Sequence, residues 1–177
     1  MSKKKLMIIT TLIAFLLCFP FHFVYDKFPN FITSILFPIN ESIWEHTKII
    51  PTSTLIYTLI YLIKNKNLNN NFLLGNTIAS IVSIFLLIII YTPLYILFKE
   101  NFIIAISVML IVIMISQKIS YFIIKKDKIK YSNFISFIII VLIYTIFGIL
   151  SYKPLKTMIF YDPLNELYGI NTYILME

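Results

Sequence analysis

The chain has 177 residues, of which 59% are hydrophobic, 16% are aromatic and 13% are charged, and its formal net charge is +7. Soluble domains are about half apolar and about a quarter charged, so this composition excludes a soluble globular domain and predicts an integral membrane protein. The only cysteine, Cys18, excludes an intrachain disulfide or a metal cluster of cysteines within one chain, and we expect it to be a small buried apolar residue.

Five segments that contain long apolar runs follow one another along the chain, at residues 6–24, 41–63, 72–98, 102–124 and 132–152, and the apolar run of the second covers about residues 49–63. A membrane-crossing helix needs about 20 apolar residues, and each segment is close to that length or longer. Lipid offers the backbone no hydrogen-bond partner, and the segments lack strand-like alternation, so each must be helical. We therefore predict an all-α integral membrane protein with a single domain over residues 1–177, five transmembrane helices and an outer tail at 153–177.

The first segment resembles a secretory signal because the lysines at positions 3–5 precede its apolar run. Small residues of the kind that mark a cleavage site are missing from its end. We expect it to be retained as the first transmembrane helix.

A shorter apolar stretch, residues 28–37, separates the first two predicted spans. It is too short to cross the hydrocarbon and predicts an interfacial or re-entrant segment, which Pro38 ends. Asn40 is a suitable N-cap for the next helix, which would then begin at Glu41. Pro51 lies inside that helix and predicts a kink. Farther along, residues 162–166 read as a turn in the tail.

The lysines predict the orientation of the chain. Ten fall at one set of helix ends (Lys3, Lys4, Lys5, Lys64, Lys66, Lys118, Lys125, Lys126, Lys128 and Lys130) and five at the other (Lys27, Lys48, Lys99, Lys153 and Lys156). The positive-inside rule makes the first set cytoplasmic, so the amino terminus would be inside and the carboxyl terminus outside. Seven of the eight acids fall on the outer side. The abundance of Lys, Asn and Ile is typical of AT-rich genes and favours a bacterial cell membrane protein.

The densest group of polar side chains in the chain is at residues 37–48, which contain two carboxylates, an imidazole, an ammonium group and the only tryptophan. Ionisable groups beside a bilayer are costly, so this group is the candidate functional site. On a helix starting at Glu41, one stripe would carry Glu41, Trp44, Glu45 and Lys48, and a neighbouring stripe Ser42 and His46. His22, at the outer end of the first helix, would face them. We take as candidate catalytic residues Glu45, His46, Glu41 and His22, and as candidate binding residues Asn40, Ser42, Trp44 and Lys48.

Several interpretations of these residues remain open. In a purely structural one, the two acids complement the helix dipole, Lys48 pairs with Glu45, and Trp44 anchors the interface. Alternatively, the imidazoles and carboxylates, joined by Asp26, Asp162 or Glu166, suit zinc or another divalent metal. Ser42 beside His46 could also be a nucleophile with its base. A small proton- or cation-coupled carrier or channel subunit is a further alternative, although the later helices lack central ionisable residues.

The motif Pro38-x-Asn40-Glu41-Ser42-x-Trp44-Glu45-His46-x-Lys48, preceded by His22 and followed by Tyr168-Gly169-Ile170, resembles a family of small uncharacterised polytopic membrane proteins of Gram-positive bacteria. The resemblance implies membership and marks the same polar positions, without an activity.

The leading functional hypothesis from the sequence is an outward-facing Glu/His pocket that binds or processes a lipid-like or amphipathic small molecule. Whether it is an enzyme stays open, and a non-catalytic membrane scaffold is the remaining alternative. The expected partners are membrane lipids, which the lysine-rich inner loops would meet, and not nucleic acid. Small residues three apart, such as Gly148 and Ser151, permit close helix contact and leave a homo-oligomer open.

Overall fold

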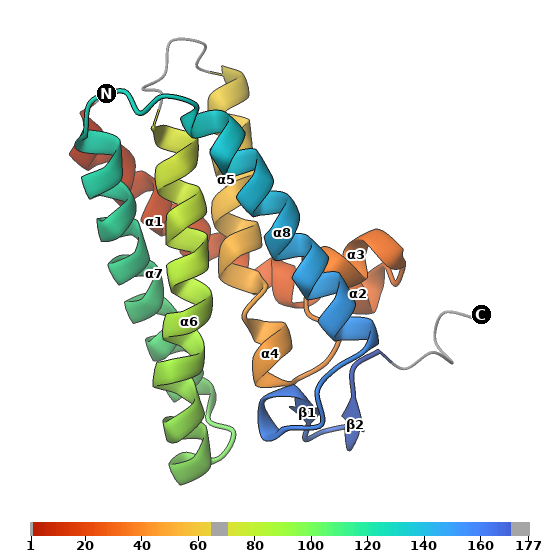
Figure 1. The fold of residues 1–177 in the computed structure, drawn as a ribbon. Helices are drawn as coiled ribbons and strands as arrows, with labels where there is room; N and C mark the ends of the chain where they lie inside the picture. The colour runs from red at the N-terminus through yellow and green to blue at the C-terminus, as the bar shows by residue number, and fades with distance from the viewer. Residues whose placement is uncertain (1, 65–70, 171–177) are drawn as a thin grey trace.

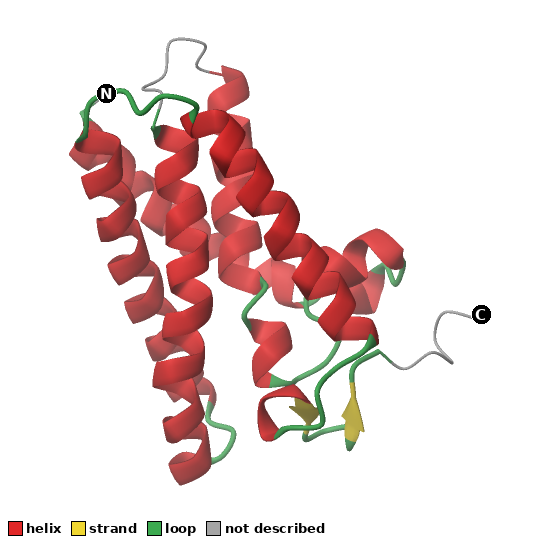
Figure 2. Ribbon diagram, viewed as in Figure 1, coloured by secondary structure: helices red, strands yellow, loops and turns green. Residues whose placement is uncertain are grey.

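A computed structural model describes residues 2–64 and 71–170 of the chain. Figure 1 shows a bundle of long helices, and Figure 2 shows that helices make up most of the described chain. The helices are α1 (Lys3–His22), α2 (Val24–Lys27), α3 (Phe31–Leu36), α4 (Ile43–His46), α5 (Ile49–Lys64), α6 (Phe72–Phe98), α7 (Phe102–Lys125) and α8 (Ser132–Tyr152). A 3-10 turn, η1 (Met158–Phe160), and two strands, β1 (Tyr161–Asp162) and β2 (Leu167–Tyr168), follow them.

Four helices are long and apolar enough to cross a membrane, namely α1 with its continuation α2, then α6, α7 and α8. The predicted bounds 72–98 and 132–152 are those of α6 and α8, and α7 ends one residue beyond the predicted 124. A fifth span is not confirmed. Helix α5 has 16 residues, which is about 24 Å at 1.5 Å per residue, whereas the hydrocarbon core is about 30 Å thick.

The prediction of one continuous helix over residues 41–63 is wrong. The chain forms one turn, α4, leaves the α-helix at Thr47 and Lys48, and starts again as α5. In a continuous helix residue 51 would donate its backbone N–H to the Thr47 carbonyl, but Pro51 has no N–H. Thr47 instead bonds back to Trp44 through its own N–H (3.0 Å) and its hydroxyl (2.6 Å). Pro51 therefore sits in the first turn of α5 and does not kink a longer helix.

The predicted short segment at 28–37 contains the short helix α3. Asn30 caps it, because its side-chain oxygen accepts hydrogen bonds from the backbone N–H groups of Ile32 (2.9 Å) and Thr33 (3.0 Å). Phe31 and Ile32 are exposed, as expected of a segment that meets lipid. The N-cap predicted for Asn40 is wrong, since Ser42 caps α4 by accepting a bond from the Glu45 N–H (3.3 Å).

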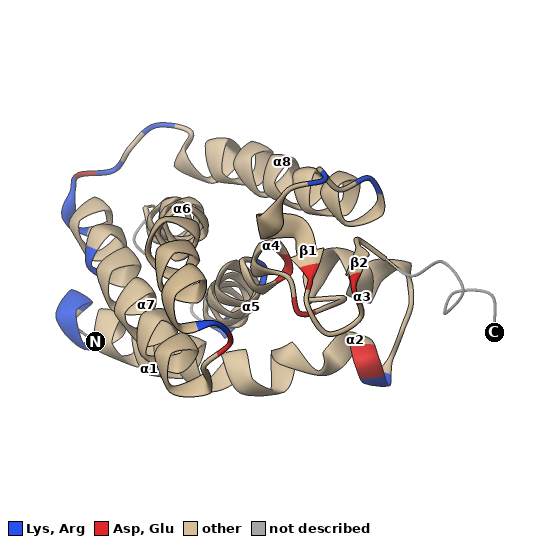
Figure 3. Cartoon of the chain, turned by 90° about the horizontal axis from the view of Figure 1, so that it is seen from below, with Lys and Arg blue, Asp and Glu red and all other residues tan. Residues whose placement is uncertain are grey.

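Figure 1 shows that the long helices run between two ends of the bundle. The start of α1, the end of α5 and the α7–α8 connection share one end, and α4, the α6–α7 connection and the β1–β2 hairpin lie toward the other, the hairpin end. Seen from the hairpin end, acidic residues gather around α2, α4 and the hairpin, and lysines cluster at the start of α1 and in the α7–α8 connection (Figure 3). Lys66 of the predicted inner loop and residues 171–177 of the predicted tail lie outside the described residues.

The long helices pack as one connected bundle. Helix α1 lies against α5 and α7, while α6 contacts α5, α7 and α8. The α6–α7 contact is close at Gly75, where a Cβ atom would lie 2.9 Å from the Ser120 carbonyl oxygen. One apolar cluster fills the centre near α1, α5, α6 and α7, and a second joins Trp44 to α8 and η1.

The described part of the tail, residues 153–170, forms the hairpin and packs against the segment before α4. Strands β1 and β2 pair antiparallel with Tyr161 opposite Tyr168, and Asp162 closes the turn by accepting hydrogen bonds from the Leu164 N–H (3.0 Å) and the Asn165 side chain (2.8 Å). This confirms the turn predicted at 162–166. The Asn40 side chain donates to the Gly169 carbonyl (3.0 Å), which ties the tail to the segment before α4.

Gly169 gives a direct test of this docking. Its φ is +71°, and a Cβ atom would lie 2.5 Å from the Ser151 carbonyl oxygen. We expect Gly169→Ala to lower the free energy of unfolding by more than about 1 kcal/mol, because a side chain is strained there and has no space. Gly148→Ala is the matched control, since its nearest neighbour would be a flexible Ile35 atom at 3.4 Å. Equal thermal stability of the two variants in detergent would contradict the docked tail.

Candidate functional site

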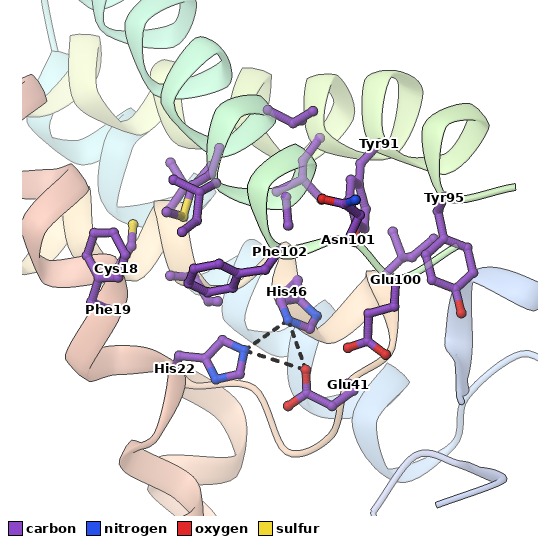
Figure 4. Close-up of a pocket in the computed structure, with 18 of the residues that line it drawn as sticks. Cys18, Phe19, His22, Glu41, His46, Tyr91, Tyr95, Glu100, Asn101 and Phe102 are labelled. Atoms are coloured by element: carbon purple, nitrogen blue, oxygen red, sulfur yellow. Dashed lines mark hydrogen bonds and ion pairs between the residues drawn. The ribbon is translucent and has the colours of Figure 1, made fainter. Parts of the chain in front are cut away.

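Three predicted site residues converge at the hairpin end. The Nε2 atoms of His22 and His46 are 3.0 Å apart, and Glu41 Oε2 lies 3.6 Å from the first and 3.3 Å from the second. Figure 4 shows the two rings and the carboxylate pointing toward one another. These three residues are hereafter called the His/Glu cluster. Among the described residues, this is the group whose donor atoms lie close enough together to hold a metal ion.

The His/Glu cluster is built from the ends of two helices and from one connection. His22 is the last residue of α1, His46 is the last residue of α4, and Glu41 lies in the connection just before α4. The interruption after α4 sets the position of His46. Its Nδ1 lies 2.9 Å from the Ser42 carbonyl oxygen one turn earlier, a contact that fixes the ring orientation.

The charges of the His/Glu cluster are coupled. Hydrogen bonds from the imidazoles to the Glu41 carboxylate hold its pKa well below the usual range, and the bond from His22 has the larger effect, followed by that from His46. The Glu41 carboxylate therefore stays ionised beside the two imidazoles.

Glu45 does not join the His/Glu cluster. Its side chain is 1% exposed and forms an ion pair with Lys48, which is 0% exposed. Lys48 Nζ also donates to the Ser34 carbonyl (2.7 Å) and the Ser151 hydroxyl (2.6 Å), and the backbone N–H of Ile39 donates to Glu45 (3.1 Å). The pair thus joins α3, α4 and α8. The structural interpretation had predicted the pairing of Lys48 with Glu45, but not these further contacts. Lys48 is enclosed by protein, so it cannot reach a lipid headgroup.

The remaining predicted binding residues also have partners within the protein. The Ser42 hydroxyl caps α4, and His46 contacts the Ser42 carbonyl, so the nucleophile-and-base arrangement is not formed. Trp44 is 9% exposed and stacks on Phe160 with ring centroids 5.0 Å apart, so it is a core residue. Asn40 bonds to Gly169 and, through its side-chain oxygen, to the Ser42 N–H (3.0 Å).

A cavity of about 350 Å³ adjoins the His/Glu cluster. It lies between α1, α5, α6 and α7, and its walls are mainly apolar, with Phe19, Leu87, Ala105, Ile106 and Met109 among them. His22, Glu41 and His46 line one part of it (Figure 4). Glu45, Ser42 and the three outer acids Asp26, Asp162 and Glu166 are not among its lining residues.

Two lining residues were missed by the sequence analysis. Glu100 and Asn101, in the α6–α7 connection, border the cavity together with Tyr91 and Tyr95 of α6 (Figure 4). Asn101 also caps α7 by accepting bonds from the N–H groups of Ile103 (3.1 Å) and Ile104 (3.2 Å). The only available signal was the position of Glu100 among the predicted outer acids.

The fold and the site together define a helical protein of membrane-spanning type, with a His/Glu cluster at the edge of an apolar cavity. The chain belongs to the family of unknown function DUF6512, whose profile matches residues 1–170. Comparison with curated proteins and with solved structures gives no match.

The Glu45–Lys48 ion pair can be tested by a double-mutant cycle. Removing one charge leaves the other buried and unpaired, so we expect Glu45→Gln and Lys48→Met each to lower the free energy of unfolding by about 3–5 kcal/mol. The double variant should lose clearly less than the two single losses combined. Denaturation in detergent micelles measures all four proteins, with Glu166→Gln as the exposed-carboxylate control. Additive losses would show that the two charges do not interact.

Proposed function

We propose that this protein is a cell-membrane protein whose His/Glu cluster and adjoining cavity bind or process an amphipathic small molecule. One observation carries the proposal: a single cavity has apolar walls from four helices and is also lined by a cluster of three ionisable groups. An apolar cavity with a few converging polar groups is the usual form of a small-molecule site. The ligand would place its chain along the apolar walls and its polar head at the His/Glu cluster.

The size and lining of the cavity support a ligand with one chain. Its volume of about 350 Å³ is near the lower end of the range for small-molecule sites, roughly 300–1,000 Å³. The walls include Phe19 from α1 and Met109 from α7, both suited to a flexible hydrocarbon chain. A two-chain lipid would not fit in this space, so we propose a fatty-acid-like or single-chain amphiphile.

The partial exposure of the cluster's side chains supports a ligand that arrives from water or from the headgroup region. The side chains of His46 and Glu41 are 26% and 27% exposed, whereas Glu45 and Lys48 are enclosed. We therefore assign ligand or acid–base work to His22, Glu41 and His46, and a positioning role to Glu45, which the sequence hypothesis had placed in the site.

For the membrane arrangement we propose five crossings, with α4 and α5 together forming the second one over residues 43–64. In this arrangement the hairpin end is extracytoplasmic, the amino terminus is cytoplasmic and the carboxyl terminus is outside. The lysines at the start of α1 and in the α7–α8 connection support this orientation. A bacterial, Gram-positive origin is part of the same proposal and rests on the composition and the motif.

Ligand binding can be measured with dansyl-labelled undecanoic acid as the probe. We expect saturable binding by the wild-type protein. Ala105→Trp should weaken that binding by at least roughly tenfold, or about 1.4 kcal/mol, because the indole fills the cavity. Val141→Trp is the matched control, since Val141 lies on α8, is 47% exposed and does not line the cavity. Probe binding that Ala105→Trp and Val141→Trp alter equally would contradict the proposed chain site.

Orientation can be measured with single cysteines. In a Cys18→Ser background, Lys128→Cys and Lys156→Cys should react with an impermeant maleimide from opposite sides of the membrane. Intact cells should label only the second variant, and inverted vesicles only the first. Labelling of both variants from one side would contradict a crossing by α8, and labelling of Lys128→Cys in intact cells would contradict the proposed orientation.

A further inference from the structure

We propose that His22, Glu41 and His46 are the three protein ligands of one divalent metal ion, with zinc the best suited, and that the fourth coordination position opens into the cavity. Only the identity of the fourth ligand rests on the proposed function. The metal site itself is argued from the described side chains alone.

The spacing of the three donor atoms agrees with tetrahedral zinc coordination. Zinc bonds to imidazole nitrogen or carboxylate oxygen are about 2.0–2.1 Å long, which places any two ligand atoms of a tetrahedron about 3.3 Å apart. The three separations here are 3.0, 3.3 and 3.6 Å. A single ion can therefore contact all three atoms with shifts of a few tenths of an ångström.

The orientation of His46 also favours a metal. The carbonyl oxygen of Ser42 can only accept a hydrogen bond, so the Nδ1 atom 2.9 Å away must carry the proton. In the neutral ring, Nε2 then carries no proton, and its lone pair is directed at His22 and Glu41. Metal-binding histidines commonly donate their other ring N–H to such a backbone carbonyl, which fixes the tautomer and the ring orientation.

Charge around the cavity favours a cation. Among the described residues that line it there are two carboxylates, Glu41 and Glu100, and no lysine. The nearby Lys48 cannot neutralise Glu41, because its ammonium group is committed to Glu45. A divalent ion would offset the lining carboxylates, and two histidines with one glutamate are the protein ligands of a well-known type of catalytic zinc site.

The fourth position would belong to a water molecule or to the polar head of the amphiphile. Zinc in such a site lowers the pKa of bound water and polarises carbonyl or phosphoryl oxygens. The residues place this chemistry beside apolar walls, where the carboxyl or ester end of a single-chain amphiphile would lie. Glu100 borders the same space without belonging to the metal-ligand group.

The test is zinc binding by the full-length protein, purified in detergent with a histidine-free affinity tag and stripped of metal with a chelator. Elemental analysis after dialysis against zinc should give about one ion per chain. His22→Gln, Glu41→Gln and His46→Gln should each weaken zinc binding by at least about tenfold. Glu100→Gln, which removes a carboxylate from the same cavity but not from the metal-ligand group, should keep one ion per chain and weaken zinc binding much less than the three cluster variants.

Cobalt separates loss of a ligand from loss of folding. Cobalt-loaded wild-type protein should show the intense visible absorption of a four-coordinate site, and Glu41→Gln should change that spectrum while its elution on gel filtration stays that of the wild type. Wild-type protein without stoichiometric zinc, or three cluster variants with undiminished zinc affinity, would overturn the assignment. If metal-stripped protein binds dansyl-undecanoic acid but no zinc, the metal site alone fails. If it binds zinc but no probe, the proposed ligand class fails and the metal site stands.

Discussion

The buried ion pair between Glu45 and Lys48 is the interaction on which the rest of the structure depends. Both side chains lie inside the protein, and their hydrogen bonds reach α3 through Ser34, α8 through Ser151 and the chain before α4 through Ile39. A buried pair gains little over an apolar replacement, but either charge alone is costly. The elements around α4 are therefore held together by the need to keep both charges paired.

That constraint explains how a short polar turn can stand beside apolar helices. With Pro51 unable to continue the hydrogen-bond pattern, the chain separates α4 from α5, and Lys48 turns inward toward Glu45. His46, on the neighbouring side of the same turn, then points at His22 from α1 and at Glu41. One face of a single helical turn stabilises the fold, and the other face supplies the site.

Much of the fold could be predicted from sequence because long apolar segments carry a strong signal. The bounds of α6 and α8 were predicted in this way. The segment that contains α3 was recognised because it is too short to cross the hydrocarbon, and the turn closed by Asp162 was predicted from its turn-forming residues. The break at Thr47 and Lys48 was not, because helical periodicity was assumed to continue through Pro51. The continuous helix placed Glu45 beside Glu41 on one stripe, whereas the broken helix separates their roles.

The candidate site could likewise be predicted from the sequence only in part. His22, Glu41 and His46 were selected because ionisable groups are rare in this chain, and the structure brings all three together. Their separation from Glu45 depends on tertiary contacts with Ser151, more than a hundred residues away, which no local pattern contains. Glu100 borders the cavity because α6 and α7 pack beside α1 and α5, so the sequence indicated only the side of the membrane on which this acid lies.

X-ray absorption at the zinc edge tests the central claim most directly, because it reports the atoms bound to the ion. The claim is that the broken helix directs His46 toward His22 and Glu41 to form one metal site. For the zinc-loaded protein we predict a four-coordinate ion with two imidazoles, one carboxylate and one further light atom. A six-coordinate ion surrounded by oxygen, or a spectrum without imidazole scattering, would contradict it.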